Sequence, residues 1–391
     1  MLDSVKMSAL QEVDGNVASP RVYPDNKIKS LESIRGLAAV LVVIHHVPNW
    51  NTLIHDVRFI QNGYLLVDLF FVLSGFVIYN AYADKIATVP QLVRFQFLRF
   101  GRLYPVHLLF LAVFVAIEAS KYFAHSRLGM AMPNTTPFKE SGWTAFVEQI
   151  FLLQAIGPTG NALTFNSAAW SISVEFYTYL IFGLTILYAY RAKHIVFIIF
   201  VCITMPLLIT RTTFGSTDFI RCIAGFSTGC LTAIASRKLT LRVHPAMSAL
   251  VFIALMLFLA VETNAHYNSL TYLLTAALIV SLTASQDGWL HSLLKLRFLT
   301  WLGTISYSIY MSHTAVIWAF NQVFRVVFKR PVLFLDDRMT PQLPLFATAI
   351  SYVLVVVCVL ILSHLTYVLV EDPLRKKSRK TGFPGNFEYR R

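Results

Sequence analysis

Arg35 and His46 lie eleven residues apart in an apolar stretch, a spacing that would place both side chains on one side of a helix. At about 100° per residue, eleven residues come within about 20° of three full turns and place His46 about 16 Å further along the axis. His45 would point well away from that side. A guanidinium can hold an anion, and a neutral imidazole can accept a proton. The pair therefore predicts an anion site followed by a general base, or alternatively a snorkelling arginine and a hydrogen-bonded core histidine.

Two carboxylates lie in apolar stretches, where an ionised side chain is costly unless it has a partner. Asp68 interrupts the run Val-Asp-Leu-Phe-Phe-Val-Leu-Ser-Gly-Phe, and Glu175 ends the run Trp170-Ser-Ile-Ser-Val-Glu. Asp68 could orient a catalytic histidine or brace an arginine or tyrosine in the core, and bracing is favoured. Glu175 falls in the second turn of a predicted helix, where it faces either a cavity or a partner in the bundle.

Two further groups of polar residues have helical spacing. Arg99 and Arg102 are three residues apart and therefore share a helix face, where a phosphate or pyrophosphate would fit. The alternative for this pair is ordinary anchoring of a membrane helix by basic residues at the cytoplasmic surface. Ser306, Tyr310 and His313 also fall on one side of a predicted helix and could line a channel.

The composition of the chain indicates the kind of scaffold that must position these residues. Of 391 residues, 56% are hydrophobic and only 14% are charged, whereas a soluble domain carries roughly 25% charged residues. Soluble α/β, all-β and disordered classes are therefore excluded. The formal charge of +13 does not fit a nucleic-acid binder, whose basic residues would cover a soluble module. A very apolar and strongly basic chain is typical of a multi-span membrane protein with a basic cytoplasmic face.

Ten apolar stretches are long enough to cross a bilayer, which needs about 20 residues of helix. They centre on residues 31–49, 63–82, 103–123, 168–190, 195–211, 218–236, 246–262, 269–285, 298–320 and 344–370. A shorter apolar piece, 143–157, contains Glu148 and Gln149 and fits a re-entrant segment better than a crossing. In the second stretch, Ser74 and Gly75 predict close helix packing, because small residues let two backbones approach.

The distribution of basic residues orients these stretches. If the N-terminus is cytoplasmic and 143–157 does not cross, most of the 33 lysines and arginines fall on the cytoplasmic side. The predicted outer loop 321–343 breaks this rule, because it carries four basic residues, Arg325, Lys329, Arg330 and Arg338. The predicted fold class is an all-α polytopic integral membrane protein of the cell membrane. It has ten transmembrane helices, a short re-entrant segment and cytoplasmic N- and C-termini.

One domain is predicted over residues 29–375, between a cytoplasmic N-terminal tail, 1–28, and a basic cytoplasmic C-terminal tail, 376–391. The four cysteines show no Cys-x-x-Cys spacing, so we expect no disulfide framework and no metal site. Phosphate loops, Gly-x-Ser-x-Gly elbows and dinucleotide fingerprints are absent from the sequence, so we expect no permanently bound cofactor. Any chemistry would then depend on His, Arg, Glu and Asp side chains within the membrane.

Six motifs together resemble the acyltransferase 3 family, membrane-bound enzymes that O-acylate carbohydrates and related acceptors. They are Arg35-Gly-Leu with His46, the run around Asp68, Arg99-x-x-Arg102 with Tyr104-Pro105, Trp170-Ser-Ile-Ser-Val-Glu175, Ser306-Tyr-Ser-Ile-Tyr310 with His313, and Glu371-x-Pro373-x-Arg375. The resemblance covers about Leu31 to Arg375. No soluble esterase-like domain follows the last predicted span, so we expect a stand-alone transferase. One departure is visible. The family commonly continues Glu-Glu-Gln-Phe-Tyr, whereas Glu175 is followed here by Phe-Tyr-Thr, so roles of the second glutamate cannot be transferred.

The resemblance implies that acyl-CoA, usually acetyl-CoA, is the donor substrate and that the acceptor is a hydroxyl of an exopolysaccharide or lipid-linked sugar. No nucleic-acid partner is expected. The residues predicted to bind coenzyme A are Arg35, Arg99 and Arg102. The residues predicted to be catalytic are His46, Glu175 and Asp68. The residues predicted to bind the acceptor substrate are Trp170, Tyr310 and His313.

In the expected mechanism, His46 accepts a proton from the acceptor hydroxyl as that hydroxyl attacks the thioester, while Glu175 or Asp68 fixes the tautomer of the imidazole. A covalent acyl group on His46, or on a nearby tyrosine or serine, is a variant of this scheme. The alternative from another class is a secondary transporter or flippase, which is also compatible with ten helices and buried charges. Against it, the sequence shows no paired, symmetric segments interrupted by Gly or Pro.

Overall fold

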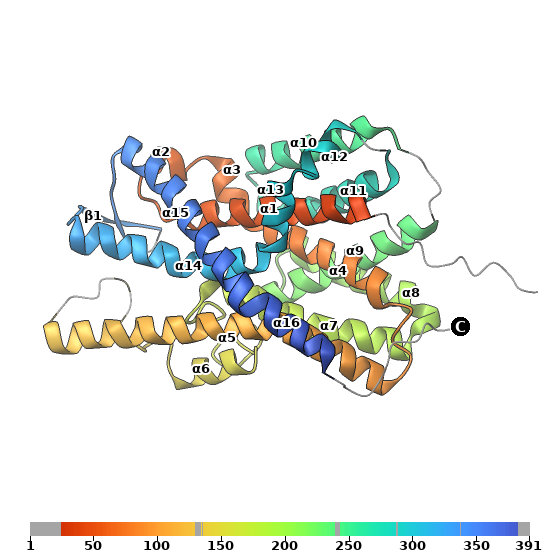
Figure 1. The fold of residues 1–391 in the computed structure, drawn as a ribbon, viewed down its shortest axis with the longest axis horizontal. Helices are drawn as coiled ribbons and strands as arrows, with labels where there is room; N and C mark the ends of the chain where they lie inside the picture. The colour runs from red at the N-terminus through yellow and green to blue at the C-terminus, as the bar shows by residue number, and fades with distance from the viewer. Residues whose placement is uncertain are drawn as a thin grey trace, which may run out of the picture.

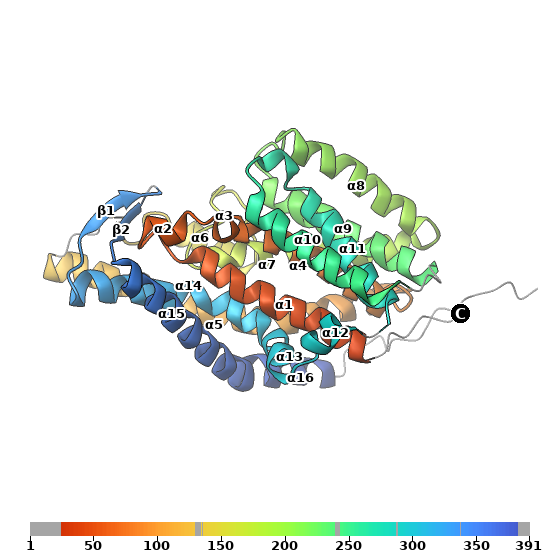
Figure 2. The same ribbon diagram turned by 90° about the horizontal axis from the view of Figure 1, so that it is seen from above.

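The computed structural model describes residues 25–129, 134, 136–238, 243–286, 288–336 and 338–381. The helices form an elongated bundle, and many of the long ones run roughly along its length (Figure 1). Helix α1 (Asp25–His46) passes through the middle of the bundle. The pair α14 (Ser306–Gln322) and α15 (Leu345–Thr366) lies on one side of it, and α11 (Leu270–Ala284) lies on the other (Figure 2).

The other elements follow in chain order. The remaining α-helices are α2 (Thr52–His55), α3 (Arg58–Gln61), α4 (Leu66–Tyr82), α5 (Val89–Leu128), α6 (Trp143–Ile150), α7 (Trp170–Tyr188), α8 (Lys193–Ile209), α9 (Thr217–Lys238), α10 (Pro245–Val261), α12 (Trp289–Leu294), α13 (Arg297–Thr304) and α16 (Asp372–Lys380). Short 3₁₀ turns are η1 (Asn62–Leu65), η2 (Ser167–Ala169), η3 (Tyr190–Ala192) and η4 (Ala265–Tyr267), and π-helical turns are η5 (Val323–Val327) and η6 (Tyr367–Glu371).

Among the described residues, seven helical stretches are long and apolar enough to cross a membrane. They are Arg58–Tyr82, Val89–Leu128, Ser167–Tyr188, Tyr190–Ile209, Thr217–Lys238, Ala265–Ala284 and Leu345–Lys380. A shorter apolar helix is Pro245–Val261. These stretches make the chain a helical, multi-pass membrane protein. The count of ten crossings, which would need α1 and α14 as well, and the cytoplasmic placement of both termini stay predictions.

The structure differs from the expected elements in three places. The stretch 298–320 is not one helix, because the chain breaks at Ile305 between α13 and α14. Helix α5 has 40 residues and extends well beyond the predicted 103–123. The fold is also not purely helical, since β1 (Val332–Leu335) pairs with antiparallel β2 (Arg338–Pro341) in the expected loop 321–343.

The short apolar piece 143–157 forms α6, whose eight residues span only about 12 Å and cannot cross a bilayer core of about 30 Å. Its polar residues are satisfied by the loop that follows. Glu148 accepts hydrogen bonds from the backbone nitrogen and the hydroxyl of Thr159, at 2.8 and 2.5 Å. The amide nitrogen of Gln149 donates to the carbonyl of Thr164 at 2.8 Å. The piece therefore folds back on its own loop, as a segment that does not cross would.

Glycines determine how closely the central helices approach. A Cβ added to Gly75 of α4 would collide with the backbone oxygen of Phe226 on α9, and one added to Gly229 would collide with that of Val72. The two helices thus pack backbone against backbone, which confirms the packing predicted from Ser74 and Gly75. The same holds for α1 and α13, where a Cβ on Gly36 would lie 2.5 Å from the backbone nitrogen of Gly303.

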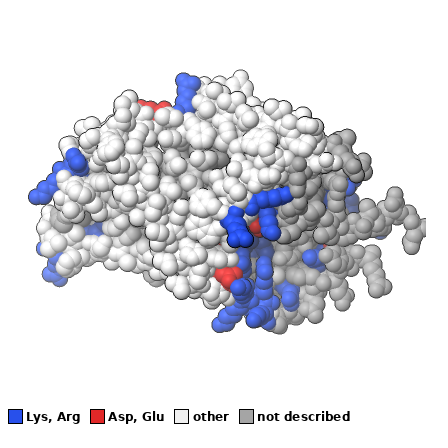
Figure 3. Space-filling view, turned by 45° about the horizontal axis from the view of Figure 1, so that its top comes forward, with Lys and Arg blue, Asp and Glu red and all other residues white. Residues whose placement is uncertain are grey.

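Apolar side chains cover the outside of the bundle, as contact with lipid requires. On α8, Ile195, Ile199 and Ile203 are exposed, and α15 exposes Val353 and Ile361 in the same way. Figure 3 shows one face on which most of the surface is uncharged and the lysines and arginines gather in a few groups. The charged side chains that could carry chemistry must therefore be sought inside the bundle.

Candidate active site

Helix α1 connects two polar cavities, because its two candidate residues line different ones. Arg35 lines a cavity of about 80 Å³, which we call the arginine cavity because Arg99 and Arg102 also line it. His46, the last residue of α1, lines a cavity of about 680 Å³, which we call the large cavity. The uninterrupted helix from Asp25 to His46 holds the two side chains three turns apart, at the spacing that the sequence predicts.

In the arginine cavity, aromatic rings hold one of the three guanidinium groups. Arg99 is buried and donates a hydrogen bond to the hydroxyl of Tyr82 at 3.1 Å. Its guanidinium carbon lies 5.1 Å from the centroid of the Tyr82 ring and 6.0 Å from that of Tyr179, distances typical of cation–π contact. Within the described chain, Arg35 and Arg102 have neither a hydrogen bond nor an ion pair within 4 Å. Two guanidinium groups are thus available to an anion.

Glu175 also lines the arginine cavity, but neighbours on α4 and α7 occupy one of its carboxylate oxygens. The hydroxyls of Ser74 and Tyr179 both donate to Oε1, each at 2.6 Å. The cavity lining therefore holds three arginines and one carboxylate, an excess of positive charge. Such an excess in a low-dielectric environment favours an anionic ligand.

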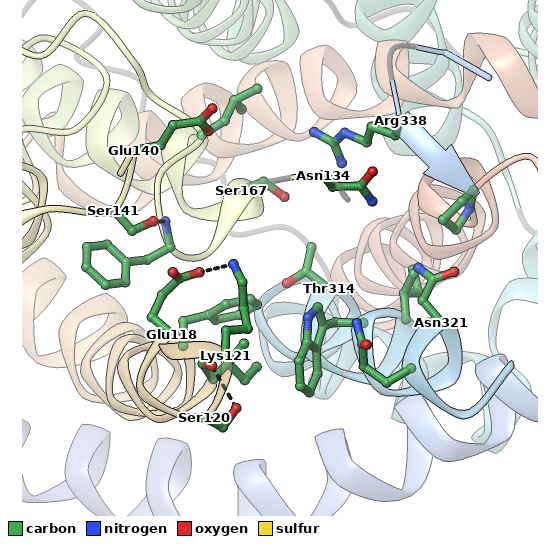
Figure 4. Close-up of a pocket in the computed structure, with 18 of the residues that line it drawn as sticks. Glu118, Ser120, Lys121, Asn134, Glu140, Ser141, Ser167, Thr314, Asn321 and Arg338 are labelled. Atoms are coloured by element: carbon green, nitrogen blue, oxygen red, sulfur yellow. Dashed lines mark hydrogen bonds and ion pairs between the residues drawn. The ribbon is translucent and has the colours of Figure 1, made fainter. Parts of the chain in front are cut away.

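The large cavity is lined by polar groups from segments that are far apart in the chain (Figure 4). Glu118 and Lys121 of α5 form an ion pair at 2.6 Å, and Thr314 and Asn321 come from α14. Further lining residues are Glu140, Ser141, Ser167, Gln322, Arg325, Arg338 and Thr340. The side chain of Asn134 holds strand β2 in place through two hydrogen bonds to the backbone of Met339, at 2.7 and 3.1 Å. The cavity therefore presents both hydrogen-bond donors and acceptors.

Arg325 and Arg338 account for two of the four basic residues in the predicted outer loop, where the positive-inside rule does not expect them. Both line the large cavity, Arg325 from η5 and Arg338 from the start of β2. The positive charge of these two residues is therefore part of a polar site, whereas Lys329 and Arg330 lie outside the cavity lining. The rule concerns residues that orient helices during insertion, and it does not address charges that line a cavity.

A backbone carbonyl fixes the tautomer of His46. Its Nδ1 lies 2.8 Å from the carbonyl oxygen of Val42, and because a carbonyl can only accept, Nδ1 must carry the hydrogen. In the neutral ring this leaves a lone pair on Nε2, as a general base requires. From the sequence, Glu175 or Asp68 was expected to fix this tautomer. In the structure, both carboxylates accept hydrogen bonds from other side chains instead.

Asp68 of α4 lies in an ion pair with Arg221 and lines neither cavity. Arg221 of α9 donates to both of its oxygens at 3.1 Å, and the Tyr272 hydroxyl donates to Oδ1 at 3.0 Å. Asp68 is only 2% exposed, so its carboxylate is both buried and fully occupied. This geometry corresponds to the bracing alternative for Asp68. No local pattern in the sequence pointed to Arg221 as the partner.

The three residues assigned to the acceptor occupy different positions. Tyr310 lines the arginine cavity and accepts a hydrogen bond from the Ser171 hydroxyl at 2.8 Å. Trp170 lies outside the lining of both cavities and packs against the guanidinium of Arg221, 5.2 Å from the ring centroid. His313 is completely buried, with its ring centroid 4.7 Å from that of His46.

The fold and these cavities define a class, namely multi-pass helical membrane proteins with a cationic cavity and a larger polar cavity joined by one helix. Residues 28–367 match the family described as "Acyltransferase domain". Because the match covers most of the chain, this protein belongs to the acyltransferase 3 family. No solved structure matches the chain.

Curated relatives are mostly longer than this chain. It is 25% identical over 384 residues to "Putative peptidoglycan O-acetyltransferase YrhL" of Bacillus subtilis (strain 168), covering 89% of this chain and 55% of that protein. It is 22% identical over 392 residues to "O-acetyltransferase OatA" of Staphylococcus aureus (strain NCTC 8325 / PS 47), covering 92% of this chain and 59% of that protein. A shorter match, 34% over 161 residues, is to "Protein 2 in picA locus" of Rhizobium radiobacter, covering 39% of this chain and 78% of that protein. The chain thus spans little more than half the length of the two named acetyltransferases.

Proposed function

We propose that this protein is a transmembrane O-acyltransferase that moves an acyl group, most simply acetyl, from acyl-CoA to a hydroxyl of a carbohydrate-type acceptor. Its family and the names of two relatives, both O-acetyltransferases, support transfer of an acetyl group to oxygen. The observation that carries the proposal is the position of Arg35 and His46 on one helix, each lining a separate polar cavity. Donor and acceptor can then approach from opposite ends of α1.

The donor would use the arginine cavity. A volume of about 80 Å³ is far too small for the nucleotide of coenzyme A, which would stay outside with its phosphates against Arg35 and Arg102. Only the acyl end would enter. In the proposed orientation this cavity faces the cytoplasm, where acyl-CoA is made, and the large cavity faces the other side.

The acceptor would use the large cavity. A sugar unit offers hydroxyls that both donate and accept, and the cavity lining supplies carboxylate, amide, hydroxyl and guanidinium groups that match them. Glycans of the cell envelope and lipid-linked sugars both fit this description. The volume of about 680 Å³ lies in the range of ligand sites that hold one small molecule or part of a polymer.

In the proposed reaction, Nε2 of His46 takes the hydroxyl proton of the acceptor as its oxygen attacks the thioester carbonyl. The new C–O bond forms, the C–S bond breaks, and the thiolate of coenzyme A leaves with the electron pair. The Val42 carbonyl keeps Nδ1 protonated and therefore leaves Nε2 free to act as the base. As the thiolate departs, negative charge develops in the arginine cavity, where the guanidinium groups would stabilise it.

Membranes containing the protein, supplied with radiolabelled acetyl-CoA, test the proposal. We expect label in a carbohydrate fraction, with the acetylated hydroxyl identified by mass spectrometry, and a loss of at least about 100-fold in His46→Gln. His45→Gln is the matched control, because His45 bonds the carbonyl of Ile60 at 2.9 Å and lines neither cavity. Normal transfer by His46→Gln would contradict the proposal. Solute uptake that needs no acyl-CoA would support the transporter alternative instead.

A further inference from the structure

His313 has a buried ring nitrogen that no part of the described chain satisfies. Its Nδ1 lies 2.7 Å from the carbonyl oxygen of Tyr310, so Nδ1 carries the hydrogen and Nε2 holds a lone pair. The side chain is 0% exposed, and Nε2 has no hydrogen-bond partner among the described residues. A buried acceptor without a partner costs free energy. His107 and His291 each have one such nitrogen as well, so what distinguishes His313 is its position.

The ring of His313 lies close to one lining residue of each cavity. On one side its ring lies 4.7 Å from that of His46, which lines the large cavity. On the other side its ring lies 5.8 Å from that of Tyr310, which lines the arginine cavity. The next residue along α14, Thr314, again lines the large cavity. His313 therefore lies in the partition that separates the two cavities.

When the acyl group moves from the donor side of this partition to the acceptor side, a proton must move in the opposite direction. The acceptor hydroxyl loses its proton on the His46 side, while the thiolate of coenzyme A forms on the arginine side. A thiolate leaves more readily when it is protonated as it departs, so a path from His46 towards the donor has a chemical use. His313 lines neither cavity, but its ring contacts those of His46 and Tyr310, and it has a free lone pair with which to receive the proton.

We propose that His313 relays the proton from His46 to the departing thiolate. This rests on the proposed function. The hydroxyl proton passes to Nε2 of His46 and from there to Nε2 of His313. Because Nδ1 stays bonded to the Tyr310 carbonyl, the same Nε2 then gives the proton to the sulfur, which leaves as the free thiol of coenzyme A. One C–O bond forms, one C–S bond breaks, and both imidazoles return to their neutral tautomers. No oxidant or further reactant is needed.

An acyl donor whose leaving group departs without a proton can distinguish a proton-relay role of His313 from a structural one. p-Nitrophenyl acetate releases p-nitrophenolate, a stable anion that absorbs visible light, while His46 still deprotonates the acceptor. For His313→Gln, we expect kcat with acetyl-CoA to fall by about 100-fold or more with KM unchanged, and acetyl transfer from p-nitrophenyl acetate to fall less than about 5-fold. His46→Gln should lose both activities. Ser312→Ala, whose buried hydroxyl bonds Ser363 at 2.9 Å on the neighbouring helix, is the packing control and should keep both.

A His313→Gln variant with the thermal stability of the wild type that loses both activities equally, or keeps full activity with acetyl-CoA, would overturn the relay. The wild-type protein gives a second measurement that does not depend on folding of a variant. Its solvent deuterium isotope effect on kcat should be larger with acetyl-CoA than with p-nitrophenyl acetate, and equal effects would also overturn the relay. If the wild type transfers acetyl from neither donor, the proposed function itself fails.

Discussion

The imidazole of His46 is held by the backbone carbonyl of Val42, four residues earlier on the same helix, at 2.8 Å from Nδ1. A carbonyl fixes the tautomer as a carboxylate would, but it adds no formal charge beside the ring. His46 therefore keeps its free Nε2 without a negative neighbour. The two carboxylates that the sequence suggested for this task are then available for other roles, and their contacts show what those roles are.

Asp68 stabilises the packing of α4 against α9 and α11, so its loss should affect folding more than chemistry. In Asp68→Asn the buried guanidinium of Arg221 loses its counter-ion, and breaking a buried pair from one side costs about 3–5 kcal/mol. We expect a clearly lower Tm in detergent, while KM values of the folded fraction stay near those of the wild type. Tyr272→Phe removes one hydrogen bond to the same carboxylate and should cost only about 1 kcal/mol. A stable Asp68→Asn protein without transferase activity would instead assign Asp68 to catalysis.

The sequence predicts features that depend on one helix and misses those that depend on distant contacts. Arg35 and His46 could be placed on one stripe because α1 is continuous, and Gly75 could be assigned to packing because it has no side chain. The partner of Asp68 is Arg221, which lies 153 residues away, and no local period encodes such a pair. The break at Ile305 was also missed, because the polar residues that follow it were assigned to the lining of a channel and not to the start of a new helix.

The lining of the large cavity could not be predicted from the sequence for the same reason. Its lining comes from the ends of α1, α5 and α14, from the loop before α7 and from the hairpin, so no single motif marks it. The basic residues of the predicted outer loop were a signal of this cavity in the sequence, since Arg325 and Arg338 did not fit the orientation rule. A charge that has no role in orienting helices is a candidate for lining a site.

The unpaired guanidinium groups of the arginine cavity should contribute to donor binding. Arg35→Ala and Arg102→Ala should each raise the KM for acetyl-CoA by about 10- to 100-fold, because a charge-assisted hydrogen bond contributes about 1.5–3 kcal/mol. The KM for the acceptor should change little. Arg127→Ala is the control, because Arg127 is exposed near the other end of α5. Kinetics in membranes at several acetyl-CoA concentrations measure this, and an unchanged donor KM in both variants would remove the arginine cavity from donor binding.

The contact between α4 and α9 should not tolerate a single added methyl group. In Gly75→Ala the new Cβ meets the backbone oxygen of Phe226, which cannot move without shifting the helix. We expect a loss of stability of about 1–3 kcal/mol, the range for overpacked cores, measured as the detergent-solubilised Tm. In Gly183→Ala the nearest atom is the end of the flexible Leu92 side chain, so this control should lose less. Equal losses in both variants would contradict rigid backbone packing as the cause.

Asp84, in the turn after α4 and outside the spanning stretches, should make stability depend on pH. Burial alone would raise the pKa of this carboxyl, but Arg237 at 2.8 Å and Lys193 at 3.5 Å hold the pKa below its ordinary value. A carboxyl with a lower pKa in the folded state stabilises the fold above its unfolded pKa of about 3.9, and this contribution is lost as the pH falls through the folded value. Asp84→Asn should therefore lower Tm by a few degrees at pH 7, and the difference from the wild type should shrink steadily as the pH falls below about 4. Thermal melts of both proteins from pH 7 to pH 3 measure this difference, and a gap that stays constant over that range would show that the charge of Asp84 does not contribute.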